Sequence, residues 1–405
     1  MFRCILLLLP LFILSCSDDT TGPETPTPLR PISSGELALA RANSAFGFSL
    51  FTSVTDATPE ENVFLSPLSV MMALGMTVNG AAGETWTGMR QALHFEGMTQ
   101  EEINQSCHDI MELLLGMDPQ VRLDIANSIW SRAGYAVEED FIETNRRYFD
   151  ADIESLDFDR ADAAGIINAW VSRMTQGRIP EIVAAPIPDW VVMYIINAVY
   201  FKGTWTQEFD PSDTRDDSFI AIDGSSRPVK MMQRTGSTRY TQDDLVEMVD
   251  LPYGWDRYSM AVLLPREGVS LAELRKKLST EQWDAWVKAL KERDVALQLP
   301  RFTLEYEVGL NDVLASMGME AAFAPGRADF SGINPENELF ISAVRHKTFV
   351  QVNEEGTEAA AVTSVEIGVT SVPSVTVMRV DRPFVFVIHE RNTGAILFIG
   401  QLTDI

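Results

Sequence analysis

Few residues of this chain are arranged in a way that would support catalytic or metal chemistry. The sequence contains no G-x-S-x-G nucleophile elbow, no H-E-x-x-H zinc motif, no P-loop and no glycine-rich dinucleotide motif. Its four histidines are scattered without the short spacings of metal ligands; they are His94, His108, His346 and His389. We therefore expect a protein that is not an enzyme and that has no metal site and no cofactor.

A thiol nucleophile also has to be considered, because Cys107 stands beside His108. Both residues fall in a helical pattern that runs from Glu101 to Leu115. A reactive thiol needs a partly exposed and electropositive surrounding, so a half-buried structural cysteine is the simpler interpretation. We expect Cys107 to be structural.

The strongest pattern lies near the C-terminal end, over Glu354–Val369 (EEGTEAAAVTSVEIGV). Alternate residues of a strand point to opposite faces, so small and apolar side chains at every second position predict a strand with one buried face. These positions are Thr357, Ala359, Ala361, Thr363, Val365, Ile367 and Val369. Pro373 follows soon after, and proline cannot continue a central strand. The stretch is either an ordinary strand or a segment with two states, an exposed loop and an inserted strand.

Helical patterns occupy much of the first half of the chain. Apolar residues recur at helical spacing over Glu36–Thr52. A second helix is predicted to run to Val78, with Ser66 as its N-cap and Pro67 at its first position.

Strand patterns dominate the second half, which together with the helices predicts an α+β fold. Val191–Phe201 is an almost continuous apolar run, as expected of a strand buried on both faces. Phe384–His389 and Ala395–Gly400 are strand-like runs separated by Asn392–Gly394, which predicts a hairpin.

Composition places the chain among globular proteins. It has 405 residues, of which 46% are hydrophobic and 22% charged, and its net charge is −26. Such an excess of acidic residues opposes binding to nucleic acid and to anionic membrane surfaces. We therefore expect no nucleic-acid partner.

The N-terminal segment is typical of a secreted, lipid-anchored protein. Residues 1–15 form a short apolar run after Arg3, which predicts a signal peptide. Ile13–Cys16 resembles a bacterial lipoprotein cleavage box, which would place the lipid on Cys16; a plain signal peptide is the alternative. Residues 16–34 are rich in Pro and Thr and predict a tether. We expect an extracytoplasmic protein, periplasmic or at the cell surface, held by its lipid anchor or otherwise secreted.

Several stretches of the chain resemble the serpin family and occur in the family's order. Asn62–Thr85 (NVFLSPLSVMMALGMTVNGAAGET) is similar to the second-helix signature. Leu123–Trp130 and Ile195–Trp205 are similar to central strands of the main sheet. Ile167–Ile179 is similar to the helix lying across that sheet, and Arg382–Leu402 to the closing hairpin. The likeness spans Glu36–Thr403.

The resemblance implies a single serpin domain over residues 35–405. In this fold helices pack around a large mixed central β-sheet with smaller sheets, and a reactive-centre loop, here about 354–376, is exposed. It also implies irreversible suicide-substrate inhibition of a serine protease or, alternatively, a cysteine protease. The cleaved loop would enter the sheet as a new strand and trap the protease as a covalent acyl-enzyme. A monomer is expected, with loop-sheet polymers under stress.

The resemblance also assigns roles to particular residues. The hinge of the loop would be Glu354, Glu355, Gly356, Thr357, Glu358, Ala359, Ala360 and Ala361. The breach, where the loop first enters the sheet, would contain Trp205, Arg301 and Glu354, with a latch between the last two. The shutter, the polar cluster beneath the sheet, would be Ser66, Ser69, Asn197 and His346.

The expected scissile bond is Thr370–Ser371, because Thr370 is the fifteenth residue when Gly356 is counted as the first. Counting back from Pro383–Phe384 gives Val372–Pro373 instead, a poor bond for proteases. Small or β-branched residues here favour an elastase-like or subtilisin-like target. The alternative function is a non-inhibitory serpin acting as a binding or chaperone-like protein. Bulky, charged or proline residues on the face of the hinge that must be buried would favour it, and Thr357, Ala359 and Ala361 on that face are none of these.

Overall fold

Two β-sheets form the core of the fold. The computed structural model describes residues 29–336, 338–357 and 375–405. Among these residues, the larger sheet has nine strands, in the order β1-β15-β14-β8-β7-β6-β9-β13, with β5 paired to β6. Its strands are β1 (Val63–Leu65), β5 (Arg215–Ile220), β6 (Ser226–Gln242), β7 (Val246–Tyr253), β8 (Tyr258–Pro265), β9 (Lys291–Pro300), β13 (Thr376–Arg379), β14 (Phe384–Glu390) and β15 (Ile396–Leu402). The predicted closing hairpin is present as β14 and β15, and every residue of these two strands is buried.

The second sheet carries the hinge. Its six strands follow the order β10-β11-β12-β4-β2-β3. They are β2 (Val121–Arg132), β3 (Asp152–Leu156), β4 (Met193–Thr204), β10 (Phe302–Gly309), β11 (Arg345–Val352) and β12 (Gly356–Thr357). β3 pairs with β2 in parallel and the other pairings are antiparallel, so the sheet is mixed.

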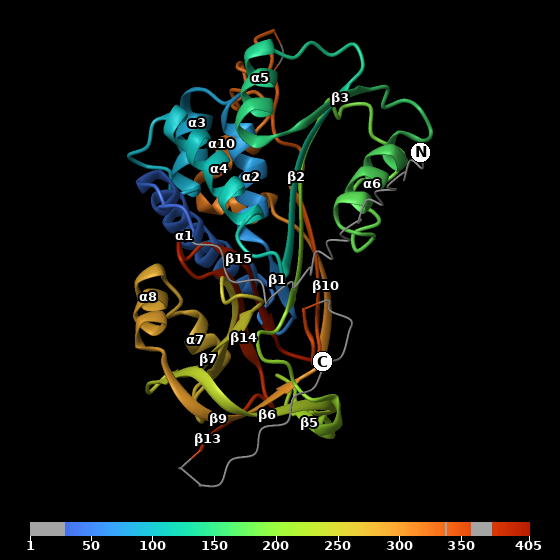
Figure 1. The fold of residues 1–405 in the computed structure, drawn as a ribbon. Helices are drawn as coiled ribbons and strands as arrows, with labels where there is room; N and C mark the ends of the chain where they lie inside the picture. Colours follow the sequence, from blue (N-terminus) through green and yellow to red (C-terminus); the bar gives the residue numbers. More distant parts are fainter. Residues whose placement is uncertain (1–28, 337, 358–374) are drawn as a thin grey trace, which may run out of the picture. The chain divides into compact units, whose positions relative to one another are not determined.

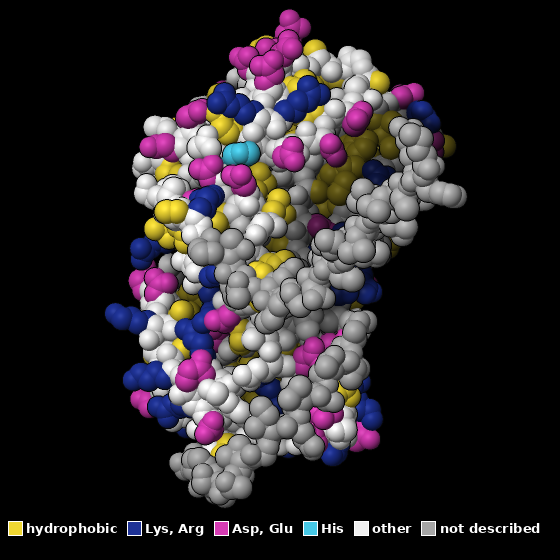
Figure 2. Space-filling model, viewed as in Figure 1, with side chains coloured by type: hydrophobic (Ala, Val, Ile, Leu, Met, Phe, Trp, Pro, Cys, Tyr) yellow, Lys and Arg dark blue, Asp and Glu magenta, His cyan; other side chains and the backbone are white. Residues whose placement is uncertain are grey.

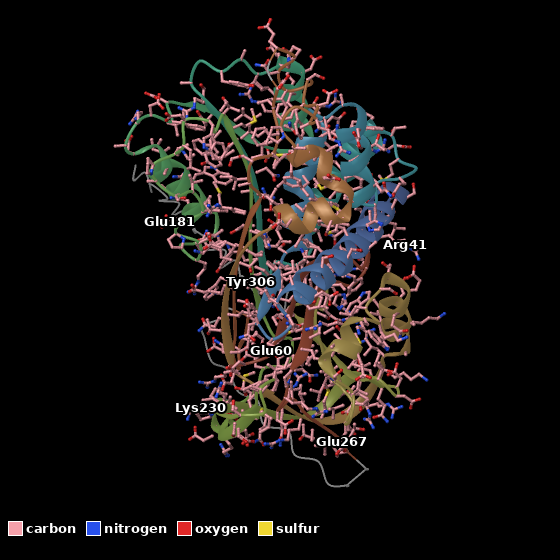
Figure 3. The ribbon with its side chains drawn as sticks, turned by 180° about the vertical axis from the view of Figure 1, so that it is seen from behind. Arg41, Glu60, Glu181, Lys230, Glu267 and Tyr306 are labelled. Carbon is pink, nitrogen blue, oxygen red and sulfur yellow. The ribbon has the colours of Figure 1, made fainter. Side chains whose placement is uncertain are left out.

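Helices cover both faces of this hinge-bearing sheet, but unequally. α2 contacts β4 and α4 contacts β2 on one face, and α6 contacts β2 and β4. Figure 1 shows α6 alone on its face, with the blue helices on the other, and Figure 3 shows the same from behind, with Glu181 beside α6. The helices in the first part of the chain are α1 (Ser34–Ala57), α2 (Pro67–Val78), α3 (Gly83–Ala92), α4 (Gln100–Leu115), α5 (Glu139–Phe149) and α6 (Ala163–Met174).

The remaining helices are short. They are the 3-10 turn η1 (Pro211–Asp213), α7 (Leu271–Arg275), α8 (Thr280–Ala289), α9 (Asn311–Leu314), the π-helical stretch η2 (Ala315–Met319) and α10 (Glu320–Phe323). In the part of the chain that the structure describes, no helix is long and apolar enough to span a bilayer. On the face shown in Figure 2, acidic and basic side chains of the described residues are interspersed.

Local sequence signals explain where the helices begin. The Ser66 hydroxyl accepts a hydrogen bond from the Ser69 amide at the start of α2, and Pro67 occupies the first turn, as predicted. α1 and α4 begin with capping boxes formed by Ser33 with Glu36 and by Thr99 with Glu102.

One expectation about burial was wrong. β4 is not buried on both faces: Ile196 and Ala198 are buried against α6, whereas Ile195 and Val199 are only half-buried. The apolar run predicted burial on both faces, but the burial of a strand also depends on whether another strand lies beside it in the sheet. Among the described residues, the edge of β4 that faces β11 is paired only at Gly203 and Thr204.

Candidate functional site

The candidate site is the place where the predicted hinge enters the second sheet, as strand β12. Gly356 lies opposite Thr204 of β4, and Thr357 lies opposite both Gly203 of β4 and Val352 of β11. No pairing among the described residues joins β4 directly to β11. Two residues of the predicted hinge therefore already separate these strands.

Gly356 occupies a position that only glycine fits. Its φ is +151°, a region that L side chains rarely adopt, and an added Cβ would lie 2.1 Å from the Gly203 carbonyl oxygen. A tight turn delivers Gly356 to the sheet: the Asn353 amide donates to the Gly356 carbonyl (3.0 Å), while Asn353 Oδ1 accepts from the amides of Glu355 (3.1 Å) and Gly356 (3.2 Å).

Thr357 is held by an aromatic group beneath the sheet. Its side chain is buried, and its hydroxyl lies 2.7 Å from the Tyr253 hydroxyl. The Tyr253 ring stacks on Trp205, with 4.4 Å between ring centroids and 13° between planes. Burial raises the pKa of Tyr253 well above its usual range, so the hydroxyl stays neutral and serves as a hydrogen-bonding group.

The expected latch between Arg301 and Glu354 is present. Arg301 Nε donates to Glu354 Oε1 (2.6 Å), and the Thr214 hydroxyl donates to the same oxygen. The Glu354 side chain is 5% exposed and that of Arg301 42% exposed. Burial alone would raise the pKa of Glu354, but the hydrogen bonds from Arg301 and Thr214 outweigh it and hold that pKa below its ordinary value.

Trp205 binds the backbone of the same turn. Its indole Nε1 donates to the Asn353 carbonyl (3.0 Å), and its amide donates to the Glu355 carbonyl (2.8 Å). The breach residues predicted from the sequence are thus brought together in one connected cluster. Beside this cluster, burial and, to a smaller extent, the nearby Glu355 carboxylate raise the pKa of Glu208.

The four predicted shutter residues also lie in contact, although not as one closed ring. His346 Nε2 accepts from the Ser66 amide (2.9 Å), and the Ser69 hydroxyl lies 3.5 Å from the Asn197 carbonyl. Burial lowers the pKa of His346 to about 4, so the ring is neutral at pH 7. Asn197 Nδ2 donates to Asn127 Oδ1 (2.7 Å), while the buried Asn197 Oδ1 has no hydrogen-bond partner among the described residues.

Several predicted positions lie outside the described residues. They are Cys16, Glu358, Ala359, Ala360, Ala361, Thr370 and Ser371. Cys107 is described and is fully buried in α4, where burial raises the pKa of its thiol to about 12. That environment is incompatible with a thiolate nucleophile at neutral pH.

Sequence reasoning missed part of the site. Thr214, Tyr253 and Asn353 complete the breach, and Asn127 completes the shutter. Thr214 and Tyr253 are each more than 100 residues from the hinge in sequence, so no local pattern links them to it. Asn353 carried a signal, since asparagine commonly bonds to backbone amides two residues on and so initiates turns.

Comparison with known proteins agrees with this geometry. A family model described as "Serpin (serine protease inhibitor)" matches residues 41–405. Leukocyte elastase inhibitor of Bos taurus is 35% identical over 377 residues, covering 90% of this chain and 99% of that protein. Neuroserpin of Homo sapiens is 33% identical over 357 residues, covering 85% of this chain and 86% of that protein.

Solved structures show the same fold. The thermophilic serpin tengpin in its native state matches with a TM-score of 0.84 and 33% identity, covering 94% of this chain and 97% of tengpin. Human thyroxine-binding globulin in complex with thyroxine matches with a TM-score of 0.82 and 27% identity, covering 92% and 99% of the two chains. Since the family model and both relatives span most of its length, this chain belongs to the serpin family, whose inhibitors include the leukocyte elastase inhibitor that it resembles.

Proposed function

We propose that this protein is an irreversible suicide-substrate inhibitor of serine proteases. One observation carries the proposal: Gly356 and Thr357 already lie as a strand between β4 and β11. The hinge thus points into a position that the rest of the loop can fill. The similarity to leukocyte elastase inhibitor supports the same function.

The register of the hinge defines where an inserted strand would lie. Each step forward from Thr357 corresponds to one step back from Gly203 on β4 and one step back from Val352 on β11. Side chains at every second position would share the inward direction of Thr357, whose hydroxyl meets the buried Tyr253. These positions are the small and apolar set that begins with Thr357 in the sequence.

The same register relates the loop to the shutter. Six residues beyond Thr357, Thr363 would lie opposite both Asn197 and His346. Its hydroxyl would then face the Asn197 Oδ1 atom that lacks a described partner. A buried unpaired polar atom costs about 1–3 kcal/mol, so insertion would remove a penalty at the centre of the sheet.

Insertion would stop the protease at a covalent step. The protease serine oxygen attacks the Thr370 carbonyl carbon, the Thr370–Ser371 peptide bond breaks, and Ser371 leaves as a free amine. The Thr370 ester would normally be hydrolysed by water. Insertion of about fourteen residues at about 3.3 Å each moves the esterified end by roughly 45 Å, which would distort the oxyanion hole before hydrolysis occurs.

Burial would supply the driving force for this movement. Val365, Ile367 and Val369 would contribute roughly 1.5–3 kcal/mol each as their side chains leave water. The ladder hydrogen bonds of the new strand add to that sum.

The target is proposed from the residues at the scissile bond. Thr370–Ser371, with Val369 and Val372 beside it, fits an elastase-like or subtilisin-like serine protease better than a trypsin-like one. A cysteine protease with the same preference would form a thioester in place of the ester.

The experiment is incubation with elastase and subtilisin, followed by boiling in detergent and mass spectrometry. We expect a covalent complex and release of the peptide that begins at Ser371. Thr357→Arg would place a charge on the buried face, so the variant should be cleaved as a substrate and form little complex. Cleavage of the wild type by every such protease with no complex would overturn the proposal.

A non-inhibitory binding protein is the second candidate. It is favoured by the likeness to human thyroxine-binding globulin, which binds thyroxine in its structure. The hinge residues here favour inhibition instead, because Gly356 and Thr357 are small enough to enter the sheet and have done so. Cleavage of the loop without any rise in thermal stability would favour the binding function.

We also propose the wider arrangement of the chain. Residues 1–15 act as a signal peptide, Cys16 carries a lipid, residues 16–34 form the tether and residues 35–405 the serpin domain. The protein would act outside the cytoplasm as a monomer. On heating, one molecule's loop could occupy the β4–β11 position of a neighbour and give linear polymers.

A further inference from the structure

The turn that connects β7 to β8, residues 253–258, contacts the hinge at one end. Tyr253 closes the turn on the hinge side, where its hydroxyl lies 2.7 Å from that of Thr357. Its ring fits closely under β4, because a Cβ added to Gly203 would lie 2.8 Å from the Tyr253 ring. The position of this ring therefore determines whether Thr357 finds a partner.

Two residues beyond Tyr253, the middle of the same turn rests on a buried carboxylate. Asp118, which follows α4 and precedes β2, is 4% exposed. Its Oδ2 accepts from the Trp255 amide (2.7 Å), and its Oδ1 accepts from the Gln120 amide (2.9 Å). Gly254 has a φ of +47°, and an added Cβ there would lie 2.8 Å from both Asp118 oxygens.

Backbone bonds fix the turn to β4 between these two contacts. The Gly254 amide donates to the Thr204 carbonyl (2.9 Å), and the Thr206 hydroxyl donates to the Gly254 carbonyl (2.8 Å). The Thr206 amide also donates to the Pro252 carbonyl (2.9 Å). A shift of the turn at Asp118 would therefore move both Tyr253 and the end of β4, the two surfaces that hold the hinge.

We propose that Asp118 and Tyr253 are positioning residues that keep the hinge inserted, with the 253–258 turn as the rigid connection between them. This inference rests on the proposed function, because it names what holds the loop ready for insertion. A desolvated carboxylate is costly, and its backbone hydrogen bonds offset that cost only in one geometry. The carboxylate thus fixes the turn, the turn fixes the Tyr253 ring, and the ring holds Thr357.

Hydrogen exchange of the hinge tests this directly. Tyr253→Phe removes the hydroxyl and should speed amide exchange at Gly356 and Thr357 by about fivefold, the factor for one hydrogen bond of about 1 kcal/mol. Asp118→Asn should speed exchange in the same peptide. Tyr240→Phe is the matched control, since it removes a buried tyrosine hydroxyl that lies outside this turn and donates to Gln242 and not to the hinge.

A double variant separates a connected unit from two separate effects. If Asp118 acts through Tyr253, Asp118→Asn should add little to hinge exchange in the Tyr253→Phe background. Independent, multiplying effects would overturn the connection, as would hinge exchange unchanged in Tyr253→Phe. Should Asp118→Asn fail to fold, Gly254→Ala disturbs the same joint.

Inhibition is the second measurement. Tyr253→Phe should raise the number of inhibitor molecules consumed per protease, while Tyr240→Phe should not. If the wild type traps no protease but hinge exchange responds as expected, the proposed function fails and the positioning role stands. If the wild type inhibits and the Tyr253→Phe hinge does not respond, only the positioning role fails.

Discussion

Replacing Gly356 by alanine tests the inserted hinge at its tightest point. The added Cβ would lie 2.1 Å from the Gly203 carbonyl oxygen and 2.8 Å from the Thr204 Cα. Both contacts are with backbone, so no side chain can rotate away to relieve them. Either β4 and β12 separate, or the hinge leaves the sheet.

The structure sets the size of the effect. Keeping alanine at a φ of +151° costs about 1–3 kcal/mol in backbone strain alone, before the clash is counted. Leaving the sheet instead gives up the Tyr253–Thr357 hydrogen bond and the ladder bonds of two residues, at about 0.5–1.5 kcal/mol each. Because the cheaper route will be taken, we expect the intact protein to lose about 2–4 kcal/mol.

Gly224→Ala is the matched control. Gly224 lies in the turn between β5 and β6 at a φ of +80°, and no atom lies within 4 Å of an added Cβ. It therefore carries the strain of positive φ, about 1–2 kcal/mol, without a clash in the sheet. Urea unfolding gives both losses of stability, and titration against elastase gives the stoichiometry of inhibition.

We expect Gly356→Ala to lose more stability than the control and to act largely as a substrate. Gly224→Ala should inhibit like the wild type. Equal losses of stability in the two variants, together with equal stoichiometries of inhibition, would refute the idea that the inserted hinge depends on contact between Gly356 and β4.

Four further outcomes follow from the same site. The pKa of His346 in the folded protein, about 4, is lower than its usual 6.5, so on acidification the unfolded chain binds a proton at this residue before the folded protein does. The free energy of unfolding should therefore fall by roughly 3 kcal/mol as the pH drops from 6.5 to 4. His346→Gln should flatten that part of the plot of stability against pH, measured by urea unfolding. Hydrogen bonds lower the pKa of Glu354, so its contribution to stability is present above the ordinary glutamate pKa and is lost on acidification. Glu354→Gln should weaken the contact with Arg301 and speed polymerisation on heating at pH 7. Equal rates of light-scattering increase in variant and wild type would contradict this. Thr363→Val should lower the melting temperature of the cleaved form more than that of the intact form, in calorimetry of both. Cys16→Ala should move the protein from the membrane to the soluble fraction, and an unchanged distribution would exclude the anchor.

Local patterns were sufficient for much of the fold. The cap at Ser66 and the hairpin at Asn392–Gly394 depend on neighbours in sequence, and both are present. The prediction that β4 is buried on both faces failed because burial depends on strands that are distant in sequence. An apolar run reports what a strand could bury, whereas Ile195 and Val199 are covered only to the extent that a neighbouring strand lies beside them.

The breach shows the same division between sequence and tertiary structure. The sequence alone determined that Gly356 and Thr357 are small enough to enter a sheet and that the following positions alternate, because side-chain size and periodicity are local properties. Only the tertiary structure decided that these two residues are already inserted and that Tyr253 receives Thr357. Contacts between residues so distant in sequence depend on how strands from three parts of the chain pack together, and no local pattern records that packing.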